Sequence, residues 1–196
     1  IANFSNKEFY DGLLLHGEAN KSATLSELQP LVGIDITNPE SDRGNSRANP
    51  HEAEVVVAQV QKSLNAGVDA NDIGVITPYT GQRDLVESEL VSEFDADKAE
   101  SIKVQTIDSF QGGQREVIIV SFTVSNDRNN SGFLAFPNEG PRRLNVALTR
   151  AKKRLVLIGN WETFSSVASH RDSSTSCADL YRRLQEYIDK QGRMVG

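Results

Sequence analysis

Short apolar runs alternate with longer amphipathic stretches along most of the chain. The runs at residues 32–37, 73–78, 102–106, 117–124 and 154–159 have the length and the β-branched content of strands. IGVITP at 73–78 is a short apolar run, which is typical of a strand buried on both faces.

Between these runs, apolar residues recur at helical spacing. Asn49 followed by Pro50 is an N-cap residue before a first-turn proline, so a helix is expected to start there. Further helices are expected over 80–94, 141–151 and 177–190. Strands that alternate with helices predict a parallel sheet covered on both faces, which is an α/β fold.

Two polar segments rich in turn-forming residues interrupt this pattern. Residues 37–50 are polar throughout and are expected to form a loop. The loop over 125–141 carries an apolar cluster of Phe133, Leu134 and Phe136. Such a cluster either tucks back against the core or binds a partner.

The composition excludes several classes of protein. The 196 residues, 38% of them hydrophobic, are enough for one packed domain, and no apolar run approaches the length of a membrane span. The single cysteine, Cys177, excludes an internal disulfide and a multi-cysteine zinc site, and the three histidines lie far apart. We therefore expect no metal site in the chain and an intracellular location, cytoplasmic or nuclear.

The chain is expected to be a piece of a larger protein. It begins with Ile1, and its one methionine is Met194. It contains no phosphate-binding G-x-x-x-x-G-K-[ST] sequence and no Asp-Glu pair after an apolar strand. A complete catalytic site is therefore not predicted within these residues.

Charge is distributed unevenly along the chain. The net charge is −6, yet residues 141–160 hold six Lys or Arg and no acid, which predicts a localised anion site unless the block is a solvated helix face. Arg143 and Arg150 are seven residues apart, about two helical turns, so on one helix they would share a face. Two guanidinium groups suit a multiply charged anion such as a triphosphate, or else the carboxylates of a neighbouring element.

Polar clusters directly follow two of the predicted strands. Residues 106–114 combine hydroxyl, carboxyl and amide groups with Gly112 and Gly113, and residues 77–83 include Pro78 and Tyr79. Ligands of parallel sheets gather at the carboxyl ends of the strands, so both clusters are candidate binding segments. The alternatives are an ordinary turn for the first, and a strand-to-helix connection with a core tyrosine for the second.

Taken together, three stretches resemble one family of motor proteins. ITPYTGQ at 76–82, QTIDSFQGGQREVIIVS at 105–121 and RRLNVALTRAKKRLVLIGN at 142–160 are similar to consecutive motifs of the second RecA-like domain of superfamily 1 helicases. The similarity is strongest to the subgroup of the nonsense-mediated-decay helicase and senataxin. Residues 2–15 resemble the stretch after that subgroup's Tyr-Arg-Met-His-Pro motif, and the match runs to about residue 165.

The resemblance implies a fold and a domain organisation. The fold would be a RecA-like parallel sheet with helices on both faces, as in P-loop NTPases but without the P-loop itself. Residues 1–196 would form a single C-terminal helicase domain, with 1–31 as an N-terminal lead-in and 166–196 as a C-terminal helical extension.

The resemblance also implies roles at a nucleotide cleft. Arg150 would be the arginine finger that reaches the γ-phosphate of ATP, and Arg143 would support the same phosphates or link motifs within the site. Gln111 and Gly112 would line the cleft. Gln114 stands where the family usually has a Glu that accepts hydrogen bonds from the ribose hydroxyls, and an amide accepts more weakly than a carboxylate.

Glu116 could take over the sugar contact only if Gly113 shifts the register. On the nucleic-acid side, the resemblance places Thr77 and Pro78 on the strand-contacting surface. Thr106 would lie near a backbone phosphate and, with Asp108, would couple that surface to the cleft.

The implied partners are single-stranded nucleic acid, either DNA or RNA, and the first RecA-like domain of the same protein. The implied cofactor is ATP with Mg²⁺, the metal being held by that first domain, and the subgroup moves 5′ to 3′. The leading hypothesis is therefore half of an ATP-dependent helicase or translocase, inactive as an isolated fragment. A catalytically decayed binding scaffold, which Gln114 favours, and the motor half of a nuclease-helicase remain alternatives.

Overall fold

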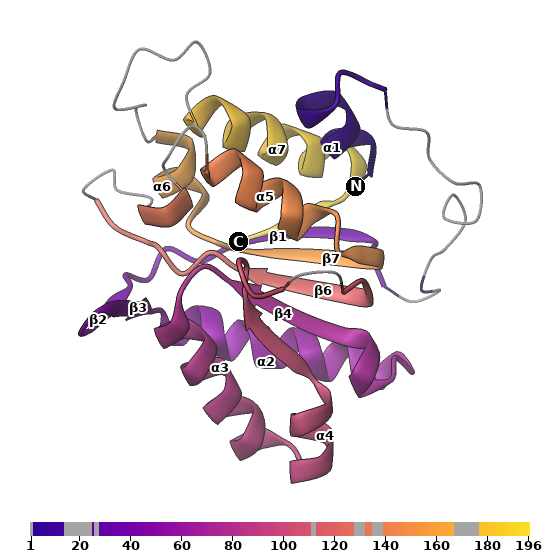
Figure 1. Ribbon diagram of the computed structural model, residues 1–196, viewed down its shortest axis with the longest axis vertical. Coiled ribbons are helices and arrows are strands. Elements are labelled where there is room, and N and C mark those ends of the chain that lie inside the picture. Colours follow the sequence, from indigo (N-terminus) through magenta and orange to yellow (C-terminus); the bar gives the residue numbers. More distant parts are fainter. Residues whose placement is uncertain are drawn as a thin grey trace.

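The protein is built on one six-stranded parallel sheet (Figure 1). The computed structural model describes residues 2–13, 25, 28–110, 113–127, 132–134, 139–166 and 177–196. Helices cover both faces of the sheet, so the α/β fold expected from the alternating pattern is confirmed.

The strands follow the order β5-β4-β6-β7-β1-β8 across the sheet. Their bounds are β1 (Leu31–Asp35), β4 (Ile73–Thr77), β5 (Lys103–Thr106), β6 (Arg115–Ser121), β7 (Ala151–Gly159) and β8 (Arg193–Val195). The first five correspond to the five predicted apolar runs. β8 was not predicted, because three residues at an edge of the sheet carry no detectable periodicity.

The two faces of the sheet carry different helices and different cores (Figure 1). One face packs α1 (Ala2–Phe9), α5 (Gly140–Leu148), α6 (Trp161–Ser166) and α7 (Cys177–Gln191) over a core rich in aromatic rings. Within it, Phe122 lies with its ring centroid 5.0 Å from that of Phe164 and 5.8 Å from that of Trp161. The other face packs α2 (Pro50–Asn65), α3 (Thr80–Glu93) and α4 (Ala96–Ser101) over an almost wholly aliphatic core.

The start of α2 agrees with the capping signal in the sequence. The side chain of Asn49 accepts a hydrogen bond from the backbone N–H of Glu52 at 3.2 Å, and Pro50 occupies the first turn. The side-chain amide of Asn49 also donates to the carbonyl of Asn38 at 2.9 Å. The cap therefore fixes both the helix start and the segment that leads to it.

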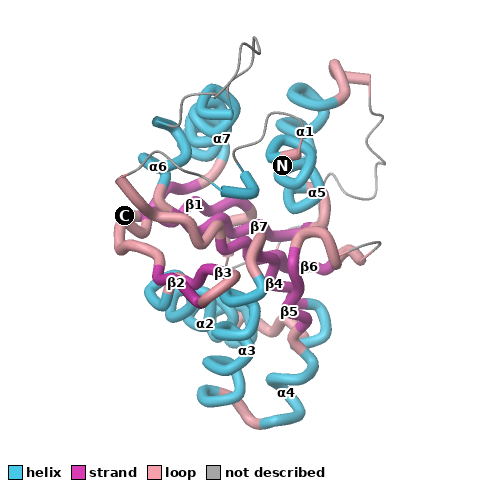
Figure 2. Tube along the Cα trace, turned by 60° about the vertical axis from the view of Figure 1, so that its left-hand side comes forward, coloured by secondary structure: helices cyan, strands magenta, loops and turns pink. Residues whose placement is uncertain are grey.

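The segment 37–50, expected to be a loop, contains a short antiparallel hairpin of β2 (Ser41–Arg43) and β3 (Ser46–Ala48), outside the main sheet (Figure 2). Gly44 supplies the positive φ of 68° that the tight turn requires. The hydroxyl of Ser46 accepts the N–H of Gly81, at the start of α3, at 2.8 Å. The hairpin was missed because its strands are polar on both faces and show no apolar alternation.

Helix α5 is shorter than the sequence predicted. It ends at Leu148, three residues before the predicted end, because β7 already begins at Ala151. Cys177 is buried at the start of α7, and burial raises the pKa of its thiol. In the described part of the chain, none of the helices is both long and apolar enough to cross a membrane.

Candidate functional site

Two of the predicted binding segments meet at the carboxyl ends of β4 and β5. Thr77 and Thr106 are register partners, and the N–H of Ile107 donates to the carbonyl of Thr77 at 2.9 Å. The hydroxyl of Thr106 donates to that of Ser109 at 2.9 Å. The structure therefore brings together the residues expected to contact nucleic acid.

These residues differ in accessibility. The side chain of Thr77 is buried, with its hydroxyl 3.0 Å from that of Thr123, whereas Pro78 is partly exposed. Tyr79 is buried, and α3 begins directly after it. The segment is thus a strand-to-helix connection with a core tyrosine, and its accessible part starts at Pro78.

Arg143 and Asp108 form a two-point ion pair between α5 and the turn after β5. Nε of Arg143 lies 3.0 Å from Oδ1 of Asp108, and Nη2 lies 3.1 Å from Oδ2. Nη2 also lies 3.0 Å from Oε2 of Glu139, and Nη1 donates to the carbonyl of Phe133 at 3.2 Å. The hydrogen bond with Asp108 raises the pKa of Arg143 above its usual range. Two roles were expected for Arg143, contact with the phosphates and a link between motifs. The bonds to Asp108 have the geometry of a link between α5 and the turn after β5.

Arg150 lies in the turn between α5 and β7. The early end of α5 means that Arg143 and Arg150 do not share one helix, so the expectation that they present a common helical face is wrong. Nε of Arg150 donates to the carbonyl of Val146 at 3.1 Å, and its own carbonyl accepts the N–H of Arg115 at 3.1 Å. Among the described residues, none forms an ion pair with the Arg150 guanidinium.

Gln114 lies beside this turn. Its Nε2 is 3.4 Å from the carbonyl of Thr149, so the side chain expected to contact the sugar is next to Arg150. The carboxylate of Glu116 lies 2.7 Å from the ammonium of Lys153 on the neighbouring strand. Gln111 and Gly112, expected to line the cleft, lie outside the described residues.

The basic block 141–160 is not one surface. Arg143 pairs with Asp108 and Lys153 pairs with Glu116. Arg154 is buried beneath α2, where Nη2 donates to Oε1 of Gln59 at 2.8 Å, and burial lowers its pKa to about 10. Three of the six cations of the block are therefore occupied by groups within the protein, and the remaining three are Arg142, Arg150 and Lys152.

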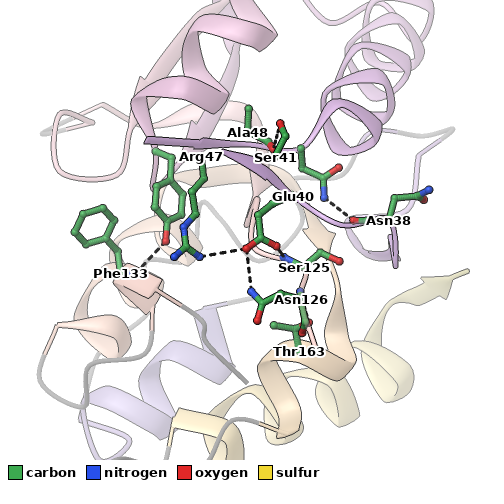
Figure 3. Close-up of polar contacts among 11 residues, drawn as sticks. Asn38, Glu40, Ser41, Arg47, Ala48, Ser125, Asn126, Phe133 and Thr163 are labelled. Atoms are coloured by element: carbon green, nitrogen blue, oxygen red, sulfur yellow. Dashed lines mark hydrogen bonds and ion pairs between the residues drawn. The ribbon is translucent and has the colours of Figure 1, made fainter. Parts of the chain in front are cut away.

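Two carboxyl groups near the carboxyl ends of the strands, that of buried Glu52 and that of Glu40, whose side chain is 7% exposed, were not singled out from the sequence. Glu40 accepts from the guanidinium of Arg47 at 3.2 Å, from the N–H of Ser125 at 2.8 Å and from the amide of Asn126 at 3.0 Å (Figure 3). It thereby joins the hairpin to the segment after β6. Its signal in the sequence was an acid in a turn-rich segment, which is too common to be diagnostic.

Glu52 is the second of these groups. Oε2 of Glu52 accepts from the hydroxyl of Ser121 at 2.6 Å and from the N–H of Thr123 at 2.8 Å, and burial raises its pKa to about 8. In the sequence it reads as an ordinary first-turn acid of a helix, which is favourable near a helix N-terminus. Its burial depends on contacts with residues about 70 positions away and could not be predicted locally.

The candidate residues thus occupy two opposite ends of the strands. Thr77, Pro78 and Thr106 lie at carboxyl ends, whereas Gln114 and Arg150 lie where β6 and β7 begin. Residues 107–110 follow the carboxyl end of β5, and residues 113–114 precede the start of β6. In the described part of the chain there is no group of three or more His, Cys, Asp or Glu that could hold a metal ion.

A six-stranded parallel sheet covered by helices on both faces is the architecture of a RecA-like domain (Figure 1). The chain belongs to the AAA domain family, which matches residues 1–162, and its relatives are superfamily 1 helicases. The resemblance seen in the motifs is therefore confirmed.

Three relatives illustrate this membership. The "Regulator of nonsense transcripts 1 homolog" of Neurospora crassa is 36% identical over 172 residues, which cover 82% of this chain and 15% of that protein. "Helicase sen1" of Schizosaccharomyces pombe is 34% identical over 209 residues, covering 100% of the chain and 12% of that protein. "DNA replication ATP-dependent helicase/nuclease JHS1" of Arabidopsis thaliana is 37% identical over 162 residues, covering 79% and 12%. The chain spans only a small part of the length of these relatives.

Proposed function

We propose that the chain is the second motor domain of an ATP-dependent helicase or translocase that acts on single-stranded nucleic acid. The observation that carries the proposal is Arg150, whose guanidinium forms no ion pair with a described residue and lies beside Gln114 where β6 and β7 begin. The names of the relatives, which include helicases, support this assignment.

ATP with Mg²⁺, the metal held by a first RecA-like domain of the same protein, supplies the phosphoanhydride bond that is hydrolysed. Arg150 stabilises the negative charge that develops on the terminal phosphate, which is the role of an arginine finger. The anchoring of Nε on the carbonyl of Val146 orients the two terminal nitrogens of the guanidinium. Because one donor is fixed in advance, less side-chain entropy is lost when phosphate binds.

The neighbouring residues have supporting roles in this proposal. Gln114 accepts a hydrogen bond from the ribose, and Gln111 and Gly112 line the nucleotide cleft. Glu116 is neutralised by Lys153 and holds the first part of β6 to β7. Arg143 acts through Asp108 as a link between α5 and the turn after β5.

The nucleic-acid strand crosses the carboxyl ends of β4 and β5 in this proposal. Pro78 is the accessible residue at the end of β4. The buried Thr77 before it is held in place by a hydrogen bond between its hydroxyl and that of Thr123. Thr106 lies near a backbone phosphate, and Asp108 connects this end of the sheet to α5. Hydroxyl groups contact nucleic-acid backbone without selecting a sequence.

Arg150→Ala in the full-length protein tests the proposal. ATP turnover should fall by on the order of 10³-fold or more, because the transition-state charge loses its partner, while nucleotide binding stays within a few-fold of wild type. Lys152→Ala, an exposed cation two residues away, is the matched control and should keep normal turnover. Both quantities are read from steady-state ATPase assays and equilibrium binding of a fluorescent ATP analogue.

Near-normal turnover in Arg150→Ala would contradict the finger assignment. A wild-type protein that binds nucleic acid but hydrolyses no ATP, with or without single strands present, would instead identify a binding scaffold. These outcomes separate the motor from the alternative that Gln114 favours.

A further inference from the structure

Two residues of the apolar cluster in the loop after β6 have different surroundings, and the third, Phe136, lies outside the described residues. Leu134 is fully buried, whereas its neighbour Phe133 leaves 48% of its surface exposed. Both belong to the short 3₁₀ helix η3 (Gly132–Leu134). An exposed phenyl ring beside a buried leucine shows that this segment is folded onto the domain and still presents one aromatic side chain to solvent.

The backbone of Phe133 is held from both sides. Its N–H donates to the hydroxyl of Tyr79 at 3.2 Å, and its carbonyl accepts from Nη1 of Arg143 at 3.2 Å. Gly132 has a φ of +55°, and a Cβ on it would overlap the hydroxyl of Tyr79. This close approach requires glycine, so the sequence itself fixes where Phe133 stands.

The ring of Phe133 lies between Tyr79 and Arg143 in a row of aromatic and guanidinium groups. Its centroid is 5.2 Å from that of Tyr79, and the guanidinium of Arg143 lies 5.2 Å from it. On the other side of the row, Arg47 lies 5.9 Å from the Tyr79 centroid and is held by Glu40 at 3.2 Å (Figure 3). The carboxylates that pair with both arginines keep the row close to neutral, so it is not a simple phosphate-binding patch.

The position of Phe133 matches the surface assigned to nucleic acid. Tyr79 directly follows Pro78 at the end of β4, and Arg143 is bonded to Asp108 after β5. Phe133 therefore stands between the two segments proposed to contact the strand. The other exposed large apolar side chains of the described residues lie elsewhere, on or after α1, on α3 and on β8 (Tyr10, Leu13, Val91 and Val195).

We propose that Phe133 stacks against an unpaired base of the bound nucleic-acid strand. The inference rests on the proposed function and adds a base contact to it. Aromatic rings bind bases of any sequence through their π-faces, and nearby guanidinium groups strengthen such stacking. A protein partner is less suitable, because one half-exposed ring surrounded by paired charges offers no contiguous apolar patch.

Phe133→Ala, Phe133→Trp and the control Val91→Ala, each in the full-length protein, provide the test. The dissociation constant for a fluorescently labelled 15-nucleotide single strand is measured from 50 to 300 mM NaCl. Phe133→Ala should weaken binding by about 5- to 100-fold, the usual cost of one lost base stack. The slope of log Kd against log salt should not change, because no phosphate contact is lost. Val91→Ala should bind as wild type does.

The tryptophan variant guards against a folding defect in the alanine variant. Phe133→Trp should keep near-normal affinity. Addition of the single strand should quench the tryptophan fluorescence of this variant more than it changes the fluorescence of the wild-type protein. Equal affinities of Phe133→Ala and wild type, an unquenched tryptophan in a bound complex, or a shallower salt slope would each overturn the stacking contact alone. A wild-type protein that binds no single strand would overturn the nucleic-acid function itself.

Discussion

At the scale of single residues, Glu52 shows how far an environment can change a side chain. It is fully buried, and Oε2 accepts hydrogen bonds from Ser121 and Thr123. Thr123 has a φ of 73°, an uncommon conformation for a β-branched residue, which the bond to Glu52 helps to hold. The cost of placing a carboxylate there is expressed as the raised pKa of Glu52, about 8, compared with an ordinary value of 4.5.

The pH dependence of stability follows from this shift. Between about pH 4.5 and 8 the folded state keeps a proton on Glu52 that the unfolded state releases, so the free energy of unfolding falls as the pH rises. Glu52→Gln imitates the protonated form and should remove this decline, which reaches at most about 1.4 kcal/mol per pH unit. Urea unfolding of both proteins at several pH values measures the difference, and parallel pH profiles would show that Glu52 titrates normally.

The contacts that could be predicted from the sequence are those between residues close together along the chain, and the contacts that could not be predicted join distant residues. The cap at Asn49 was predictable, because its partner is the N–H three residues later. The partner of Arg143 was left open between phosphate and carboxylate, and it is Asp108, 35 residues earlier. Arg154 looked like part of a basic patch but lies beneath α2. Local chemistry is therefore readable from sequence, whereas the choice of a distant partner is made by the fold.

At the scale of elements, apolar runs predicted the strands because a parallel sheet buries them on both faces. The hairpin of β2 and β3 escaped prediction, since its residues are polar and its position is set by docking on α3. The end of α5 was placed too late, because an amphipathic pattern does not reveal where the next strand starts. The consequence for the site was large, since it moved Arg150 off the helix.

The link between α5 and the turn after β5 can be measured by a double-mutant cycle. Arg143→Ala and Asp108→Ala, alone and together, should show a coupling of about 0.5–1 kcal/mol in the free energy of unfolding, because the pair is two-point but Asp108 is 69% exposed. The coupling should shrink at 1 M NaCl, which screens exposed charges. Additive losses at low salt would mean that the pair contributes nothing to holding the two elements together.

At the scale of the whole molecule, the candidate residues are separated along the strands. Arg150 and Gln114 lie where strands begin, and Thr77 and Thr106 lie where strands end. Residues 107–110 follow the carboxyl end of β5, and the bond between Arg143 and Asp108 holds them to α5. Under the proposed function, a shift at one end of the strands is transmitted through the sheet to the other end.

This arrangement predicts reciprocal binding in the full-length protein. A non-hydrolysable ATP analogue with Mg²⁺ should change the affinity for a single strand, and the strand should change the affinity for the analogue by the same factor, about 5- to 100-fold. Fluorescence anisotropy of each labelled ligand, with and without saturating amounts of the other, gives the two factors. Independent binding of the two ligands would remove the mechanical connection proposed here.

The buried cysteine gives this molecule a built-in reporter. Because the Cys177 thiol is buried at the start of α7 and its pKa is raised, an alkylating reagent reaches it only after this part of the domain opens. With one thiol in the sequence, each molecule labelled records one such opening event. The rate of modification, followed by mass spectrometry, would therefore measure how often the face of the sheet covered by α7 opens, without any added probe.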